Sequence, residues 1–311
     1  MNEIKPLLSI VVATKNRVRY CIDCIESTLN HIDTDFELIV QDNTDNYDLR
    51  EYVETRISDS RLIYNYSPPP FSSIDNFNAA MELATGEYVC LIGDDDAILP
   101  DLMKITRWAF ENDIDSVAPK RLINYIWPNE NNIESKLEIP DFSYKCESVP
   151  LAKRLISYLR DGCVRSYRNY GLPAIYHGIV RRECIEKIKS LTGHYFGGLS
   201  PDSYSSVALS QIVKNHIIMD FPLTIAGACQ TSTTRQGAQG DHRGLLKNAP
   251  HLRNREDYVW LKIVPGFYSV ETIWSESALR ALTELNKLDL LAKFSSCYLF
   301  SYALYSNLLI M

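Results

Sequence analysis

Three consecutive aspartates, Asp94, Asp95 and Asp96, follow the apolar run Tyr88–Ile92 after a single glycine. A run of five apolar residues between turn residues predicts a buried strand. Adjacent carboxylates repel one another, so they are stable when they are solvated or neutralised by a cation. Their hard oxygens favour Mg²⁺ or Mn²⁺, and Mg²⁺ is usually held by one or two carboxylates together with substrate phosphates. The alternative is an exposed acidic turn before a helix that starts near Pro100.

Polar side chains also follow the two apolar, strand-like runs at residues 7–13 and 36–40. They are Thr14, Asn16 and Arg17 after the first run, and Asp42 after the second. Strands and helices alternate through residue 118, which predicts a doubly wound parallel sheet. Ligands bind at the carboxyl edge of such sheets, so these side chains are expected to lie near the three aspartates.

Composition excludes some classes of protein. The chain has 311 residues, of which 46% are hydrophobic and 23% charged, enough for one large domain or two modest ones. The formal charge of −7 argues against a nucleic-acid binder, which needs a basic face. Eight cysteines with a single CxxC and no second pair at zinc spacing favour reduced thiols. With no signal-peptide pattern at the N-terminus and no apolar window of about 18 residues, we expect a cytoplasmic protein.

Four segments, in order, resemble the family 2 glycosyltransferases: residues 8–17, 39–43, 76–80 and 86–96. The resemblance is strong for residues 7–118, weaker for about 170–245 and negligible beyond. It implies an α/β GT-A fold, Rossmann-like, with a mainly parallel sheet flanked by helices. We therefore expect a GT-A domain over residues 1–245, with a nucleotide-sugar half (1–118) and an acceptor half (119–245). A helical C-terminal extension over residues 246–311 completes the predicted organisation.

The resemblance also implies a nucleoside-diphosphate sugar donor and a Mn²⁺ or Mg²⁺ cofactor. It places donor contacts at Thr14, Asn16, Arg17, Asp42 and Asn76. We favour a UDP-sugar, since Asp42 could accept hydrogen bonds from uracil N3–H or from ribose hydroxyls. The alternatives are a turn role for Asp42 and helix capping for Asn76 and its neighbours Asp75 and Asn78.

Within the acidic triplet, the resemblance places Asp94 near the ribose and Asp95 on the metal. Asp96 is expected to support the loop or to cap the next helix, and it is the weaker candidate for a metal contact. The family more often has an acid one residue before the aspartate pair, where this chain has Gly93. The assignment within the triplet could therefore be displaced by one residue.

Asp202 is the predicted catalytic base, because the resemblance places that base in the glycine-bearing loop before a helix expected at 202–213. An inverting transfer needs one carboxylate that takes the proton of the acceptor hydroxyl. Pro201 precedes it, which leaves Asp202 the only carboxylate in this loop. A role in the first turn of the helix is the alternative, and the two roles can coexist.

Three weaker groups of candidates remain. Arg165 and Arg168 lie in a basic, aromatic segment that could contact an anionic or sugar acceptor or form a solvated loop. His177 lies in a predicted strand at 174–180. It could contact the acceptor, or it could be a packed, hydrogen-bonded residue of the core. His242, with Arg235 and Arg243, lies in a polar loop that closes over the diphosphate in many relatives. There it could add a metal ligand or belong to a mobile surface loop.

From residue 251 onward helical spacing dominates, and residues 288–311 are apolar with only Asp289 and Lys293 charged. This segment is expected to pack on the domain or on a second copy in a homodimer. The alternative is an interfacial segment that brings the protein to the inner face of the membrane, where a lipid-linked acceptor would lie.

These patterns together predict a metal-dependent inverting glycosyltransferase. It would move a sugar to a hydroxyl of a glycan or lipid-linked saccharide in bacterial surface polysaccharide assembly. A nucleotidyltransferase is the rival enzyme, although residues 13–17 lack the glycine such proteins usually carry after the first strand. A non-catalytic nucleotide-sugar-binding protein is the other rival, and the retained Asp94, Asp95 and Asp202 argue against it.

Overall fold

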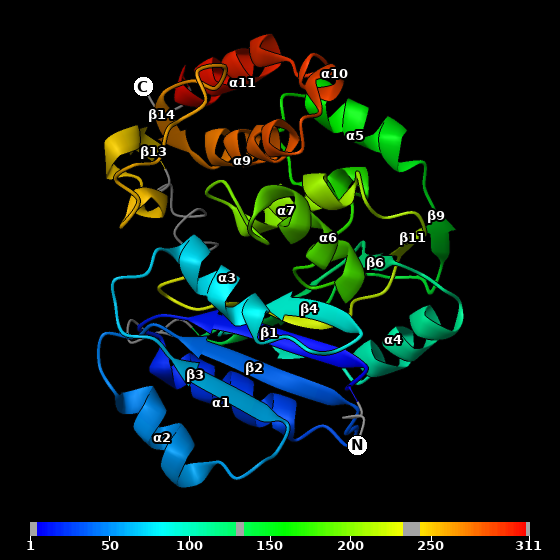
Figure 1. The fold of residues 1–311 in the computed structure, drawn as a ribbon, viewed down its shortest axis with the longest axis vertical. Coiled ribbons are helices and arrows are strands. Elements are labelled where there is room, and N and C mark those ends of the chain that lie inside the picture. Colours follow the sequence, from blue (N-terminus) through cyan, green and yellow to red (C-terminus); the bar gives the residue numbers. More distant parts are fainter. Residues whose placement is uncertain (1–4, 129–133, 233–242, 309–311) are drawn as a thin grey trace.

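The computed structural model describes residues 5–128, 134–232 and 243–308. The centre of the fold is a β-sheet of eight strands, flanked by helices (Figure 1). Its order is β3-β2-β1-β4-β10-β6-β11-β9. The strands are β1 (Leu8–Thr14), β2 (Phe36–Asp42), β3 (Leu62–Tyr66), β4 (Tyr88–Ile92), β6 (Ser116–Pro119), β9 (Cys146–Ser148), β10 (Ile179–Arg181) and β11 (His216–Met219). β1 to β4 pair in parallel, as do β6 and β11, whereas β10 and β9 run antiparallel to their neighbours. The predicted α/β architecture with a mainly parallel sheet is confirmed.

Helices cover both faces of this sheet. They include α1 (Val18–Leu29), α2 (Asp48–Arg56), α3 (Ser73–Glu82), α4 (Asp101–Glu111), α6 (Arg182–Thr192) and α7 (Pro201–Leu209). In β1, Ile10 and Val12 pack with Ile25 of α1, and Val11 packs in the cluster that contains Ala80 of α3. Successive strand residues point to opposite faces, so a strand buried on both faces must be continuously apolar. This is why β1 and β4 could be recognised from the sequence.

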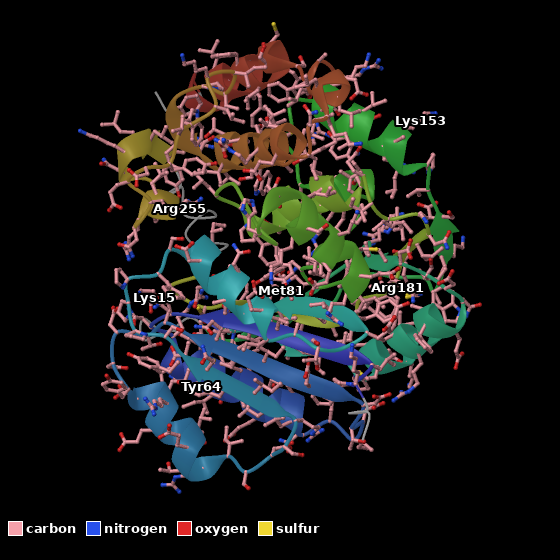
Figure 2. The ribbon with its side chains drawn as sticks, in the orientation of Figure 1. Lys15, Tyr64, Met81, Lys153, Arg181 and Arg255 are labelled. Carbon is pink, nitrogen blue, oxygen red and sulfur yellow. The ribbon has the colours of Figure 1, made fainter. Side chains whose placement is uncertain are left out.

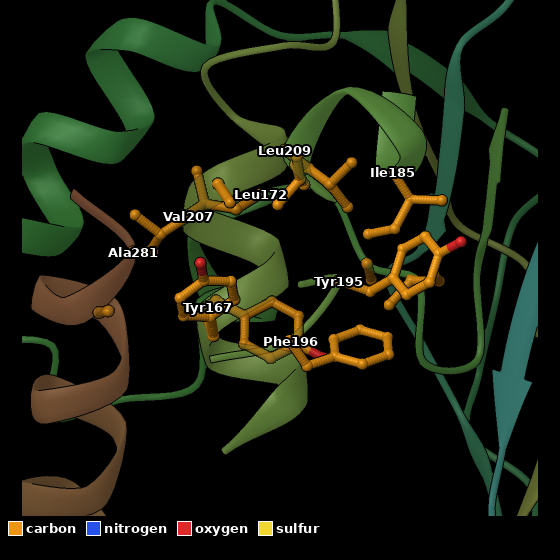
Figure 3. Packing of buried hydrophobic residues seen from close by; sticks show 14 of the residues in the cluster. Tyr167, Leu172, Ile185, Tyr195, Phe196, Val207, Leu209 and Ala281 are labelled. Carbon is orange, nitrogen blue, oxygen red and sulfur yellow. The ribbon is translucent and has the colours of Figure 1, made fainter. Parts of the chain in front are cut away.

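A second layer of the core lies above α7 in Figure 1, where α9 (Val270–Glu284) packs against α7 and α5 (Leu151–Arg160) lies nearby. All residues of α7 from Ser203 to Leu209 are buried. Figure 3 shows Val207 of α7, Ala281 of α9 and Tyr167 packed together. Helix α9 therefore shares a hydrophobic core with α7, the helix that carries Asp202.

Several element predictions were wrong. The strand expected at 174–180 begins only at Ile179, because His177 has a left-handed backbone with φ of 62°. The helix expected at 202–213 ends at Leu209, and the helix expected to be capped by Ser73 is capped by Ser72 instead. Helices were expected from residue 251 onward, but they are found only from Val270. Before it lie short turns, the 3-10 turn η3 (Pro250–Leu252), and β14 (Phe267–Ser269), which pairs with β13 (Arg243–Leu245).

The segment at 120–146 contributes strands to a second sheet. This sheet has the order β5-β12-β7-β8, with β5 (Ala97–Ile98), β7 (Ile123–Ile126), β8 (Lys136–Glu138) and β12 (Thr224–Ala228). β5 directly follows the acidic triplet and pairs with β12. The second sheet therefore lies against the acidic loop.

The predicted C-terminal helical stretch is divided into α10 (Leu288–Leu291) and α11 (Ser296–Leu308). Leu299 is buried against the core, whereas Phe300, Leu304 and Tyr305 are exposed. Among the described residues, no helix is both long and apolar enough to cross a bilayer. Association of this segment with a membrane surface or with a second copy stays a prediction.

Candidate active site

Asp96 holds the acidic loop in place. Its carboxylate accepts hydrogen bonds from the backbone N–H of Gly93 at 2.5 Å and from that of Gly227 in β12 at 2.6 Å. The Tyr176 hydroxyl donates to the same group at 3.4 Å. Asp96 does not cap α4, whose N-cap residue is Pro100. Its contacts are those of a residue that supports the loop.

Asp95 lies between the loop and β12. Its Oδ2 accepts a hydrogen bond from the backbone N–H of Cys229 at 2.9 Å, and its carbonyl accepts one from Trp127 Nε1 at 2.9 Å. Its Oδ1 accepts no hydrogen bond from the described residues and lies 3.6 Å from Nη1 of Arg17. This oxygen is therefore the one free to meet a cation.

Gly227 is expected to be intolerant of any side chain. A Cβ at this position would lie 1.8 Å from the carbonyl oxygen of Asp95, so the backbones would have to separate. Overpacking of this kind costs about 1–3 kcal/mol, and we expect Gly227→Ala to lower the free energy of unfolding by about that amount in urea denaturation. Gly266→Ala is the control, because a Cβ there meets no atom within 4 Å. Equal stability of the two variants would contradict the contact.

Asp94 is completely buried and joins the triplet to β1. Thr14 donates its hydroxyl to Asp94 Oδ2 at 2.6 Å, and Nη1 of Arg17 lies 3.0 Å from Oδ1 without an aligned hydrogen bond. Burial raises the pKa of Asp94 to about 6, with the neighbouring Asp95 adding to the rise and Arg17 opposing it.

Burial likewise raises the pKa of Asp96 to about 7, and the charge of Asp95 adds to the shift. Burial opposes the charge of Arg17, but Asp94 and Asp95 outweigh it and raise the pKa of this guanidinium. Two carboxylates, those of Asp94 and Asp95, thus face one cationic side chain, and the buried Asp96 adds a third beside Asp95. The excess of negative charge is what an additional cation would offset.

The other predicted donor residues lie in the first turns of α3, at the end of β2 and on the loop after β1. Asn76 donates Nδ2–H to the carbonyl of Thr14 at 3.0 Å, while its buried Oδ1 has no partner among the described residues. Asp42 is opposite Thr14 in the β1–β2 register, but it is buried, accepting from Thr44 N at 2.7 Å and from the Tyr64 hydroxyl at 2.6 Å. Asn16 is exposed and donates to Asp45 at 2.6 Å.

The structure therefore links Thr14 to Asn76 and to Asp94, and Asp94 to Arg17. Asn16, on the same loop as Arg17, and Asp42, at the end of β2, have other partners. In Figure 2, Lys15 lies at the carboxyl end of β1 and Tyr64 lies on β3. The contacts of Asp42 are those of a turn residue. Its contact to a nucleoside stays a prediction.

Asp202 lies in the first turn of α7 and lines a cavity of about 460 Å³. The Ser200 hydroxyl donates a hydrogen bond to its Oδ1. Tyr176 lines the same cavity and contacts Asp96. One cavity wall thus connects the candidate base with the acidic loop.

Two polar residues fix the loop before Asp202. Asn78 of α3 accepts from the backbone N–H groups of Tyr195 and Phe196 at 2.9 and 3.0 Å. Ser277 of α9 accepts from those of Leu199 and Ser200 at 3.0 and 2.9 Å. Asn78, proposed from the sequence as a polar residue at a helix start, instead positions the loop that precedes Asp202.

The weaker candidates are scattered. Arg168 is half-buried and donates to the carbonyl of Tyr176, and Arg165 is exposed. His177 is buried and hydrogen-bonded with Thr224 Oγ1 at 2.8 Å, and burial lowers its pKa well below its usual range. These contacts make His177 a neutral, packed residue. His242 and Arg235 lie outside the described residues.

The oxygen atoms of the acidic loop fit a divalent cation that is held mainly by the phosphates of a bound substrate. In the described part of the chain, three ligand atoms cluster only at Asp115, Glu183 and Cys184, away from the acidic triplet. At the triplet, Oδ1 of Asp95 is free of hydrogen bonds among the described residues. One or two carboxylates together with substrate phosphates are the usual environment of Mg²⁺.

Four residues that hold the site were not predicted from the sequence. They are Tyr176, Trp127, Gly227 and Cys229. Gly227 and Cys229 act through backbone N–H groups, which any residue but proline carries, so no side-chain type could have revealed them. A glycine inside an apolar strand was the available indication of close backbone approach.

The fold is of the GT-A type. The S. aureus TarS 1-349 structure in complex with UDP-GlcNAc aligns with 75% of this chain and 61% of that chain, at 17% identity and a TM-score of 0.53. Residues 9–155 of this chain match the model described as Glycosyl transferase family 2.

Two curated relatives each match about a third of this chain. An uncharacterized glycosyltransferase of Methanocaldococcus jannaschii is 32% identical over 114 residues, covering 36% of this chain and 39% of its own length. The GalNAc(5)-diNAcBac-PP-undecaprenol beta-1,3-glucosyltransferase of Campylobacter jejuni is 33% identical over 99 residues, covering 30% of this chain and 31% of its own length. The match thus spans about a third of these relatives.

Proposed function

We propose that the protein is an inverting glycosyltransferase that uses a nucleoside-diphosphate sugar. The observation that carries this proposal is the acidic loop at the carboxyl end of β4, where Asp94 and Asp95 face Arg17. Such an edge of a parallel sheet is where nucleotides bind. The family 2 match supports the same function. A UDP-sugar remains the favoured donor.

Asp95 would hold a Mn²⁺ or Mg²⁺ ion, with Asp96 and Asp94 buried behind it. Bound there, the ion would offset the charge of the departing nucleoside diphosphate. Arg17, half-buried and already paired with two carboxylates, would shift toward the diphosphate, because a guanidinium binds phosphate as readily as carboxylate.

Asp202 would act as the general base. The acceptor oxygen attacks the anomeric carbon, the bond from that carbon to the diphosphate oxygen breaks, and the acceptor proton passes to the Asp202 carboxylate. The Ser200 hydroxyl donates a hydrogen bond to this carboxylate, which holds it in place at the first turn of α7. The acceptor would be a hydroxyl of a glycan or lipid-linked saccharide in surface polysaccharide assembly.

Binding of the donor can be measured by thermal shift. At a concentration 100 times Kd, a ligand that binds only the folded state adds about 2.7 kcal/mol of stability. We expect one nucleotide sugar, with Mn²⁺ present, to raise Tm by roughly 5 °C or more. The same sugar nucleotide with EDTA should give a smaller shift. No shift with any nucleotide sugar, with or without metal, would contradict the proposal.

A further inference from the structure

We propose that the cavity beside Asp202 binds a neutral pyranose of the acceptor, with Trp274 as the surface on which the sugar ring stacks. This inference rests on the proposed function and adds the class of acceptor and the residue that selects it. Trp274 belongs to α9, which lies outside residues 9–155 matched by the family model. Acceptor recognition would therefore be supplied by the C-terminal part of this chain.

The cavity has the composition of a saccharide site. Asp202 and Ser200 lie on one wall, Phe77 and Tyr176 contribute aromatic rings, and Ile273 and Trp274 come from α9. Its volume of about 460 Å³ lies within the usual range of small-molecule sites, which are mostly apolar with a few placed polar groups. A pyranose presents an apolar C–H face and a polar hydroxyl rim, which matches this division.

The charge of the cavity wall selects a neutral ligand. Among the described residues that line it, none is a lysine or an arginine, Asp202 contributes a carboxylate and His251 contributes an imidazole. A phosphate or a uronic acid placed here would meet a like charge without the guanidinium or ammonium group that usually neutralises it, which is costly in a partly buried site. A neutral sugar ring meets no such penalty and can offer a hydroxyl to Asp202.

The position of Trp274 is fixed by its helix, but part of its ring surface is exposed and its indole N–H has no hydrogen-bond partner within the described residues. Its carbonyl accepts a hydrogen bond from Ser203 of α7 at 3.1 Å, and a capping box between Ser269 and Thr272 fixes the start of its helix. The ring is half-buried, and its indole N–H makes no hydrogen bond to any described residue. By contrast, the indole of Trp260 donates to the Val264 carbonyl at 3.1 Å. A fixed aromatic face with a free polar donor suits a ligand with an apolar face and a polar rim.

Fluorine NMR on protein labelled with 5-fluorotryptophan tests this directly. The chain has four tryptophans, so four resonances are expected, and Trp274→Phe and Trp260→Phe assign two of them. The methyl β-glycosides of glucose, galactose, N-acetylglucosamine and N-acetylgalactosamine serve as neutral probes. We expect at least one to shift the Trp274 resonance in a saturable manner while Trp260 stays unchanged, and methyl glucuronide to have no effect.

Three results would overturn the inference: no shift at Trp274 with any neutral glycoside, an equal shift with the glucuronide, or a response to farnesyl phosphate alone, which would make the cavity a lipid site. The test does not require turnover. A failure of glycosyl transfer in the wild-type protein is therefore distinguishable from a failure of this inference.

Kinetics give a second readout with the glycoside that binds. Loss of an aromatic face is expected to raise KM for that glycoside about two- to tenfold in Trp274→Leu and less in Trp274→Phe, with kcat and the donor KM unchanged. Trp260→Phe serves as the matched control from the same part of the chain. A fall in kcat with unchanged acceptor KM would overturn the assignment of Trp274 to acceptor binding.

Discussion

Asp202→Asn is expected to lower kcat for glycosyl transfer by about 10²–10⁴-fold, because an amide cannot accept the proton of the acceptor hydroxyl. Donor binding should be unchanged, since the acidic loop lies on a different element. The fold should also be kept, because the Ser200 hydroxyl can still donate to the amide oxygen. Transfer is measured as nucleoside diphosphate release, and donor affinity by thermal shift.

Asp101→Asn is the matched control, because Asp101 also lies in the first turn of a helix but pairs only with Lys104 on the surface. Surface ion pairs of this kind contribute about 0.2–1 kcal/mol. This variant should turn over at the wild-type rate. Wild-type turnover in Asp202→Asn would contradict the assignment of Asp202 as the base. If this variant lost stability without a change in kcat, Asp202 would have a structural role instead.

Asp95→Asn is expected to lower metal-dependent transfer by about 10²–10³-fold, because it removes the carboxylate placed to hold the cation. It should not destabilise the protein. The amide oxygen can still accept from Cys229 N, and the substitution relieves repulsion from Asp94 and Asp96. Activity is assayed against Mn²⁺ concentration, and stability in urea.

Asp96→Asn separates the two roles within the triplet. Both carboxylate oxygens of Asp96 accept backbone hydrogen bonds, from Gly93 and Gly227, so an amide must turn its NH₂ toward one of these donors. Leaving a buried donor unsatisfied costs about 1–3 kcal/mol. If Asp95→Asn proves the less stable variant and Asp96→Asn alone loses its response to Mn²⁺, the assignment within the triplet is displaced by one residue.

The donor half of the fold was predictable because its strands are buried on both faces. β4 was predicted with its observed bounds, Tyr88–Ile92, and β2 with its start at Phe36. Prediction failed where tertiary contacts override local pattern. His177 breaks an apolar run with a left-handed backbone, and the polar segment after residue 120 forms strands only because β12 pairs with it.

For the candidate site, the sequence indicated side chains but not their partners. Thr14, Arg17 and Asp94 were each singled out, yet their mutual contacts depend on strands that are 80 residues apart in the chain. Trp274 could not be singled out, because a tryptophan at helical spacing is ordinarily a core residue. Its position beside Asp202 follows from the packing of α9 on α7.

The central claim is that this chain releases a nucleoside diphosphate from a sugar nucleotide. The most direct measurement is phosphate-coupled detection of nucleoside diphosphate from a panel of UDP- and GDP-sugars, with Mn²⁺ and a mixture of neutral methyl glycosides. We predict release with at least one donor, loss of release with EDTA, and loss in Asp202→Asn. No diphosphate release from any donor, or release of pyrophosphate from nucleoside triphosphates and sugar phosphates instead, would contradict the account.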